Sequence, residues 1–131
     1  MSPDPTRAER VLLLVGGVIM TAVGVLFLVA PTTLEQGMGV MQPEAPARTE
    51  IRAVYGGIEL AVGAFLLWCW RVPRHAASGV LFAALFALGA GLGRVVGFAV
   101  EGAVDPRNLT WGALELAGGA YAAWLVIKRG R

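Results

Sequence analysis

Val11-Leu-Leu-Leu-Val-Gly-Gly-Val-Ile-Met-Thr-Ala-Val-Gly-Val-Leu-Phe-Leu-Val-Ala30 is a run of 20 residues without a charge. As a helix it is about 30 Å long, the thickness of the hydrocarbon core of a bilayer. Comparable apolar segments follow at residues 51–70, 76–100 and 109–127, and residues 31–50 form the only long connection. Because no amphipathic segment remains to cover these helices in water, the sequence predicts an all-α, four-helix transmembrane bundle that forms one domain over residues 1–131.

The composition supports a chain that faces lipid. Hydrophobic residues make up 56% of the chain and charged residues 15%, whereas a typical soluble domain has about 25% charged residues. The pI near 9.2 would on its own be compatible with a nucleic-acid-binding surface. The basic residues, however, gather at the ends of the apolar segments, so we expect them to set the topology and expect no nucleic acid partner.

The loop charges predict the orientation. Basic residues around the N-terminus, the 71–75 turn and the C-terminus are Arg7, Arg10, Arg71, Arg74, Lys128, Arg129 and Arg131. The opposite connections hold Arg48, Arg52 and Arg107. Because positive loops stay in the cytoplasm, we expect both termini to be cytoplasmic and 31–50 to be an outer loop. The first apolar run exceeds the ~7–15 residues of a signal-peptide core, so we expect a retained anchor.

Local signals predict where helices begin. Thr6 and Glu9 have the spacing of a capping box before the first segment. Asp105-Pro106 is typical of an N-cap followed by proline at the first helical position. In the outer loop, Pro43 and Pro46 predict an extended chain.

The second and fourth segments share a motif. The second contains Tyr55-Gly-Gly-Ile-Glu-Leu-Ala-Val-Gly-Ala64, and the fourth contains Trp111-Gly-Ala-Leu-Glu-Leu-Ala-Gly-Gly-Ala120. Both segments would cross the membrane in the same direction. The sequence therefore predicts two helical hairpins related as a parallel internal repeat; chance similarity between glycine-rich apolar helices is the alternative.

Small residues recur at helical spacing, which favours close packing of helices in lipid. These ridges are Gly89, Gly93 and Gly97, then Ala53, Gly57 and Ala61, and finally Gly112 with Gly119.

Three ionisable residues, Glu59, Arg94 and Glu115, lie inside the predicted spans. All three are about 9–12 Å from the outer ends of their helices, so they share one layer. A charge at the centre of a bilayer costs at least about 2.5–3.5 kcal/mol. We therefore expect Arg94 to lie between the two carboxylates and to form a bidentate pair with one of them, which leaves the other as a candidate for protonation.

Four neighbours extend this layer outward because they share helix faces with the three charges. The predicted ligand-binding residues are Glu59, Arg94, Glu115, Tyr55, Arg52, Glu101 and Trp111, which would line an outward-facing polar cavity. A purely structural role, in which the charges only fix helix register, is one alternative. Movement of protons or ions, or docking of a partner membrane protein, is another.

The sequence gives little support to an enzyme. Cys69 and His75 are the only cysteine and histidine, both lie far from the polar layer, and no Ser/His/Asp set or metal cluster is present. We expect Cys69 to be a small buried apolar residue, and we expect no metal and no cofactor.

Two segments carry a resemblance to a known family: Glu50-Ile-Arg-Ala-Val-Tyr-Gly-Gly-Ile-Glu-Leu60 and Gly93-Arg-Val-Val-Gly-Phe-Ala-Val-Glu-Gly102. On these residues the chain resembles a family of small bacterial membrane proteins known only as a domain of unknown function, and it is distantly similar to the four-helix DoxX family. The resemblance covers nearly the whole chain and implies a four-helix fold in a bacterial cytoplasmic membrane. It implies no activity, and the loose link of DoxX-like proteins to quinones and redox partners assigns no residue here.

Three functions follow from these observations. The first is binding of a small lipophilic or amphipathic ligand, such as a lipid or a quinone, in the polar layer. The second is an accessory subunit of a larger membrane complex, or a homo-oligomer. The third is a small transporter, which ranks lowest because four-helix multidrug exporters place a glutamate in their first helix and residues 11–30 have no charge.

Overall fold

The computed structural model describes residues 4–33 and 45–129. Its elements are α1 (Arg7–Val29), α3 (Ala45–Ile51), the π-helix η1 (Arg52–Ile58), α4 (Glu59–Arg71), the 3-10 turn η2 (Pro73–His75), α5 (Ala76–Glu101) and α6 (Pro106–Arg129). Since α3, η1 and α4 are continuous, the described chain is a bundle of four long helical segments, which confirms the predicted all-α fold. Arg7–Val29, Ala45–Arg71 and Pro73–Glu101 are long and apolar enough to cross a membrane.

Side chains cap two of the helices. The Thr6 hydroxyl accepts a hydrogen bond from the Glu9 main-chain N–H (3.3 Å), and the Glu9 carboxylate accepts one from the Thr6 N–H (2.6 Å). This confirms the capping box before α1. At α6, Asp105 Oδ1 accepts bonds from the N–H groups of Arg107 (2.9 Å) and Asn108 (3.1 Å), as expected of an N-cap.

The second segment begins earlier than the sequence predicts. Residues Ala45–Ile51 are helical, whereas Pro46 predicts an extended chain. That prediction is wrong because a proline in the first helical turn loses no helical hydrogen bond. Pro43 lies outside the described residues.

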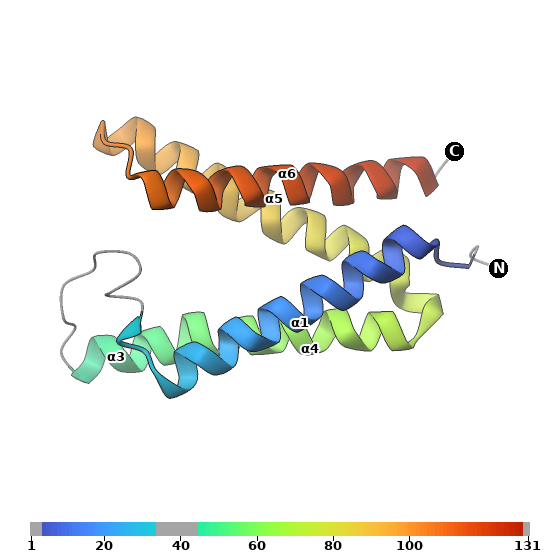
Figure 1. The fold of residues 1–131 in the computed structure, drawn as a ribbon, viewed down its shortest axis with the longest axis horizontal. Helices are drawn as coiled ribbons and strands as arrows, with labels where there is room; N and C mark the ends of the chain where they lie inside the picture. The colour runs from blue at the N-terminus through green and yellow to red at the C-terminus, as the bar shows by residue number, and fades with distance from the viewer. Residues whose placement is uncertain (1–3, 34–44, 130–131) are drawn as a thin grey trace.

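The four segments form two antiparallel hairpins. α1 packs along η1 and α4, and α5 packs along α6. Figure 1 shows α4 and α6 running in the same direction, as a parallel repeat requires, although the repeat itself remains a prediction. The hairpins touch mainly through α5, which contacts α1 and α4. They converge at the end that carries both termini, which we call the termini end, and diverge toward α3 and the α5–α6 connection, which we call the loop end.

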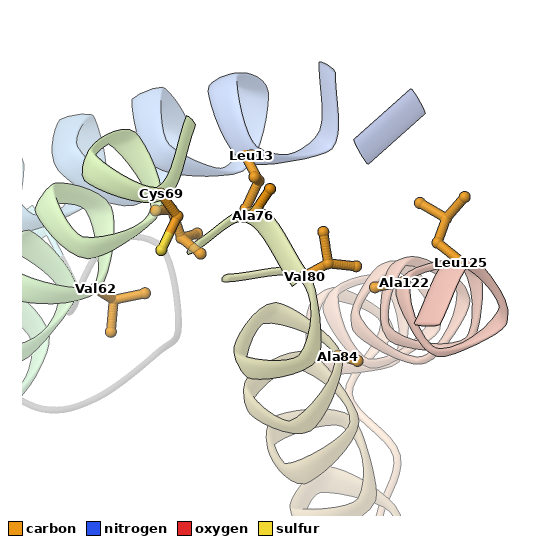
Figure 2. Close-up of a cluster of buried hydrophobic side chains, with 9 residues drawn as sticks. Leu13, Val62, Cys69, Ala76, Val80, Ala84, Ala122 and Leu125 are labelled. Carbon is orange, nitrogen blue, oxygen red and sulfur yellow. The ribbon is translucent and has the colours of Figure 1, made fainter. Parts of the chain in front are cut away.

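A buried cluster joins the hairpins near the termini end (Figure 2). Leu13 of α1, Cys69 of α4 and Val80 of α5 are each fully buried. Small residues of the same cluster, Ala76 and Ala84, allow α5 to approach its neighbours. Cys69 is thus a buried apolar residue, as expected. Elsewhere large apolar side chains face outward, which is the surface that a bilayer would cover.

Glycines bring the helices of the first hairpin into contact. A Cβ on Gly24 of α1 would lie 2.5 Å from the Leu60 nitrogen and 2.9 Å from the Gly56 carbonyl oxygen. Both atoms belong to the main chain of the second segment and have no rotamer by which to move away. Close approach at Gly24 therefore fixes the separation of α1 from this segment.

The predicted ridge on α5 behaves differently. A Cβ on Gly89, Gly93 or Gly97 would meet nothing within 4 Å among the described residues. This ridge therefore makes no close helix contact within the described bundle, although Gly91 of the same helix packs on Leu116 of α6.

Replacing Gly24 with alanine tests the close approach. Gly24→Ala should lower the free energy of unfolding by about 1–3 kcal/mol because the hairpin must separate to admit the methyl group. Gly89→Ala is the matched control and should be neutral or slightly stabilising, since alanine favours a helix. Reversible unfolding in mixed detergent micelles measures both variants, and equal stabilities would contradict this packing.

Candidate functional site

Arg94 on α5 and Glu115 on α6 form a bidentate ion pair. Arg94 Nε lies 2.8 Å from Glu115 Oε2, and Arg94 Nη2 lies 3.0 Å from Oε1. Arg94 Nη1 also donates to Asn108 Oδ1 at 2.9 Å. The two charged side chains are 25% and 22% exposed. Three of the five guanidinium N–H groups are thus bound by α6, and the expected bidentate pair is present.

The sequence of α6 places both partners of Arg94 on one helix face. Asn108 and Glu115 are seven residues apart, which is almost two helical turns. Gly112 lies between them, and a Cβ there would come within 3.3 Å of Arg94 Cδ. Asn108 was not among the predicted site residues, although its seven-residue spacing from Glu115 was a usable signal.

Glu59, the first residue of α4, supplies the second carboxylate of the layer. Its Oε2 is buried and has no hydrogen-bond partner in the described part of the chain. The carboxylates of Glu59 and Glu115 interact electrostatically, so Glu59 lies near the ion pair. It does not share Arg94 with Glu115, because both carboxylate-directed bonds of Arg94 go to Glu115.

Beyond Arg10, α1 offers Glu59 no cation. Glu115 finds its cation on the preceding helix of its own hairpin, whereas α1 carries no charged residue after Arg10. On α1, the part of the helix that corresponds to the Arg94 region of α5 is therefore apolar. The described residues of the first hairpin therefore donate no hydrogen bond to Glu59 Oε2.

A π-helix separates Arg52 from Glu59. In an α-helix, residues seven apart share a face, but the wider i→i+5 turn of η1 rotates the chain less per residue. Arg52 accordingly turns toward α1, where its Nε donates to the Leu28 carbonyl oxygen at 3.1 Å. Tyr55 packs edge-to-face on Phe27 and interacts electrostatically with Arg94. The structure thus brings Tyr55, but not Arg52, to the polar layer.

Glu101 and Trp111 lie toward the loop end. Glu101 lines a cavity of about 300 Å³ together with Arg94, Phe98 and Asn108. Trp111 is 50% exposed, one turn before Glu115. Arg94 is the residue that connects this cavity to the ion pair.

A second ion pair, at the termini end, is absent from the predicted site. Arg129 Nη1 lies 2.9 Å from Glu9 Oε1, and the Glu9 side chain is only 2% exposed. The pair joins the first helix to the last. The sequence signalled Glu9 as a cap but not its partner, because nothing local relates residues 120 positions apart.

A family described as "Domain of unknown function (DUF4345)" matches residues 8–126. The chain belongs to the DUF4345 family. This confirms the predicted resemblance to an uncharacterised family, while the likeness to DoxX proteins and the bacterial origin stay predictions. The DUF4345 match contains every predicted site residue. Comparisons with curated proteins and with solved structures find no match.

Proposed function

We propose that this protein binds a small lipophilic or amphipathic ligand, lipid-like or quinone-like, beside Glu59, Arg94 and Glu115. The observation that carries the proposal is Glu59 Oε2, a buried acceptor that receives no hydrogen bond from the described residues. Leaving such a group unpaired costs about 1–3 kcal/mol, and more when it is charged. A ligand with a hydroxyl or amine proton would remove that cost, and in its absence protonation of Glu59 would reduce it.

The chemistry of the ion pair supports the same ligand class. Arg94 has two guanidinium N–H groups that bind none of the described residues. Together with Glu59 Oε2, they offer donors and an acceptor within one apolar environment. A polar group with both a carbonyl and a hydroxyl oxygen suits this arrangement, with an apolar tail among the helices.

Tyr55, Glu101 and Trp111 are proposed as the surrounding wall. Tyr55 interacts electrostatically with Arg94, and Glu101 borders the 300 Å³ cavity. Arg52, held by the Leu28 carbonyl, would act at the rim rather than on the ligand.

The proposed setting is a bacterial cytoplasmic membrane with the termini end in the cytoplasm. Arg7, Arg10, Arg71, Arg74 and Lys128 supply the positive-inside signal. α6 would be the fourth crossing, since its 24 residues span about 36 Å. The ligand site would then open to the outer leaflet.

A Glu59→Gln variant tests the proposal. Wild-type protein should carry a co-purified lipophilic molecule in native mass spectrometry, or bind added decyl-benzoquinol, whose hydroxyl groups can donate to Glu59. Losing the charged acceptor should weaken binding about tenfold or more, because hydrogen bonds to charged groups contribute about 1.5–3 kcal/mol.

Glu50→Gln is the matched control, since Glu50 is an exposed acid on the same helical segment. It should bind as the wild type does, and both variants should keep the helical circular dichroism spectrum. Wild-type affinity in Glu59→Gln, or neither co-purified ligand nor decyl-benzoquinol binding in wild-type protein, would contradict the proposal.

The open ridge Gly89, Gly93 and Gly97 favours a second candidate, an interaction subunit that packs another transmembrane helix here. The chain's single cysteine is fully buried, so Gly93→Cys introduces one accessible thiol. If the second candidate is correct, this thiol should cross-link in native membranes and Leu114→Cys, on exposed α6 surface, should not. Equal cross-linking of the two, or none, would rule out the ridge as an interface.

A further inference from the structure

A lateral groove runs between α1 and the second hairpin, toward the termini end. It has a volume of about 740 Å³, within the ~300–1,000 Å³ typical of ligand pockets. One wall is a stripe on α1, formed by Val11, Val15 and Ile19, each about half exposed. The groove is distinct from the polar layer, because none of Glu59, Arg94 and Glu115 lines it.

The groove exists because small residues face the α1 stripe. Ala83 and Ala87 of α5 and Gly118 and Ala122 of α6 form the opposite side. A Cβ on Gly118 would meet none of the described residues within 4 Å, so these residues leave the space beside it unfilled. An apolar space of this size, open along the side of a helix bundle, has the shape and polarity of an acyl-chain site.

The termini end of the groove is cationic. Arg7 lines the groove itself. Ala8 and Tyr121 border both the groove and a neighbouring cavity of about 430 Å³, which Lys128 also lines. The Lys128 ammonium lies 5.0 Å from the Trp124 ring centre, close to the membrane-interface position expected for that ring.

The acidic residues at this end do not cancel the charge. Glu9 lines the neighbouring cavity but is paired with Arg129. Among the described residues that line the two cavities, Asp4 is the other acid, against the two cations Arg7 and Lys128. An apolar trough that leads to a net positive mouth matches a phospholipid, with its tail in the trough and its phosphate at the mouth.

We propose that the groove between α1, α5 and α6 binds an anionic phospholipid of the adjacent leaflet, with an acyl chain along Gly118 and the phosphate near Arg7 and Lys128. This site would be occupied independently of the ligand proposed beside Glu59.

Lipid retention measured by native mass spectrometry tests the proposal. The protein is exchanged into micelles that contain phosphatidylglycerol or phosphatidylcholine with identical acyl chains. Wild-type protein should retain phosphatidylglycerol about tenfold better, since each nearby basic residue attracts anionic lipid. Arg7→Gln with Lys128→Gln should abolish this preference, and it leaves the apolar walls intact.

Gly118→Leu should fill the groove and lose the retained phosphatidylglycerol. Ala120→Leu is the control, because Ala120 is an exposed residue of the same helix that does not line the groove; it should retain lipid as the wild type does. Equal retention of the two lipids by wild-type protein, or unchanged retention in both Gly118→Leu and the double glutamine variant, would overturn the proposal. Binding of decyl-benzoquinol should be unaffected by Gly118→Leu, which separates this site from the one beside Glu59.

Discussion

Hydrocarbon solvates charge poorly, so a guanidinium group within a transmembrane helix bundle needs a paired anion beside it. In this protein Glu115 meets Arg94 through two hydrogen bonds, and Asn108 takes a third. These contacts fix α5 against α6 at a defined register, since a shift of one residue would rotate Glu115 away from Arg94. The second hairpin is thus held together by polar contacts as well as by the packing of Gly91 and Gly119.

The first hairpin also carries an ionisable residue inside the bundle, but it compensates that residue less completely. Its glutamate, Glu59, occupies the corresponding place in the motif, but its partner helix offers no cation. The buried core lies near the termini end, and the hairpins diverge toward the loop end (Figure 1). Among the described residues, Glu59 Oε2 is thus a buried acceptor without a donor, and its carboxylate interacts electrostatically with that of the satisfied ion pair. This difference between the two hairpins is the physical basis of the proposed ligand site.

Much of this architecture follows from the sequence. Apolar runs of bilayer length predict the helices, and the insertion cost of charge predicts that Arg94 meets a carboxylate. Features that depend on non-local geometry could not be predicted from the sequence. One is the Glu9–Arg129 pair, which joins the two ends of the chain. Another is the divergence of the hairpins, which leaves the Gly89, Gly93 and Gly97 ridge open among the described residues. The π-helix η1 was also missed, because an assumed α-helical period places Arg52 beside Glu59, whereas the wider turn sends it to Leu28.

A double-mutant cycle on Arg94→Met and Glu115→Met, read by reversible unfolding in mixed micelles, tests most directly whether these two charges are stable only as a pair. Each single variant leaves one uncompensated charge in the bundle and should lose about 1–3 kcal/mol, whereas the double variant should lie near wild type. Single variants as stable as the wild type, or losses that simply add in the double variant, would contradict the account.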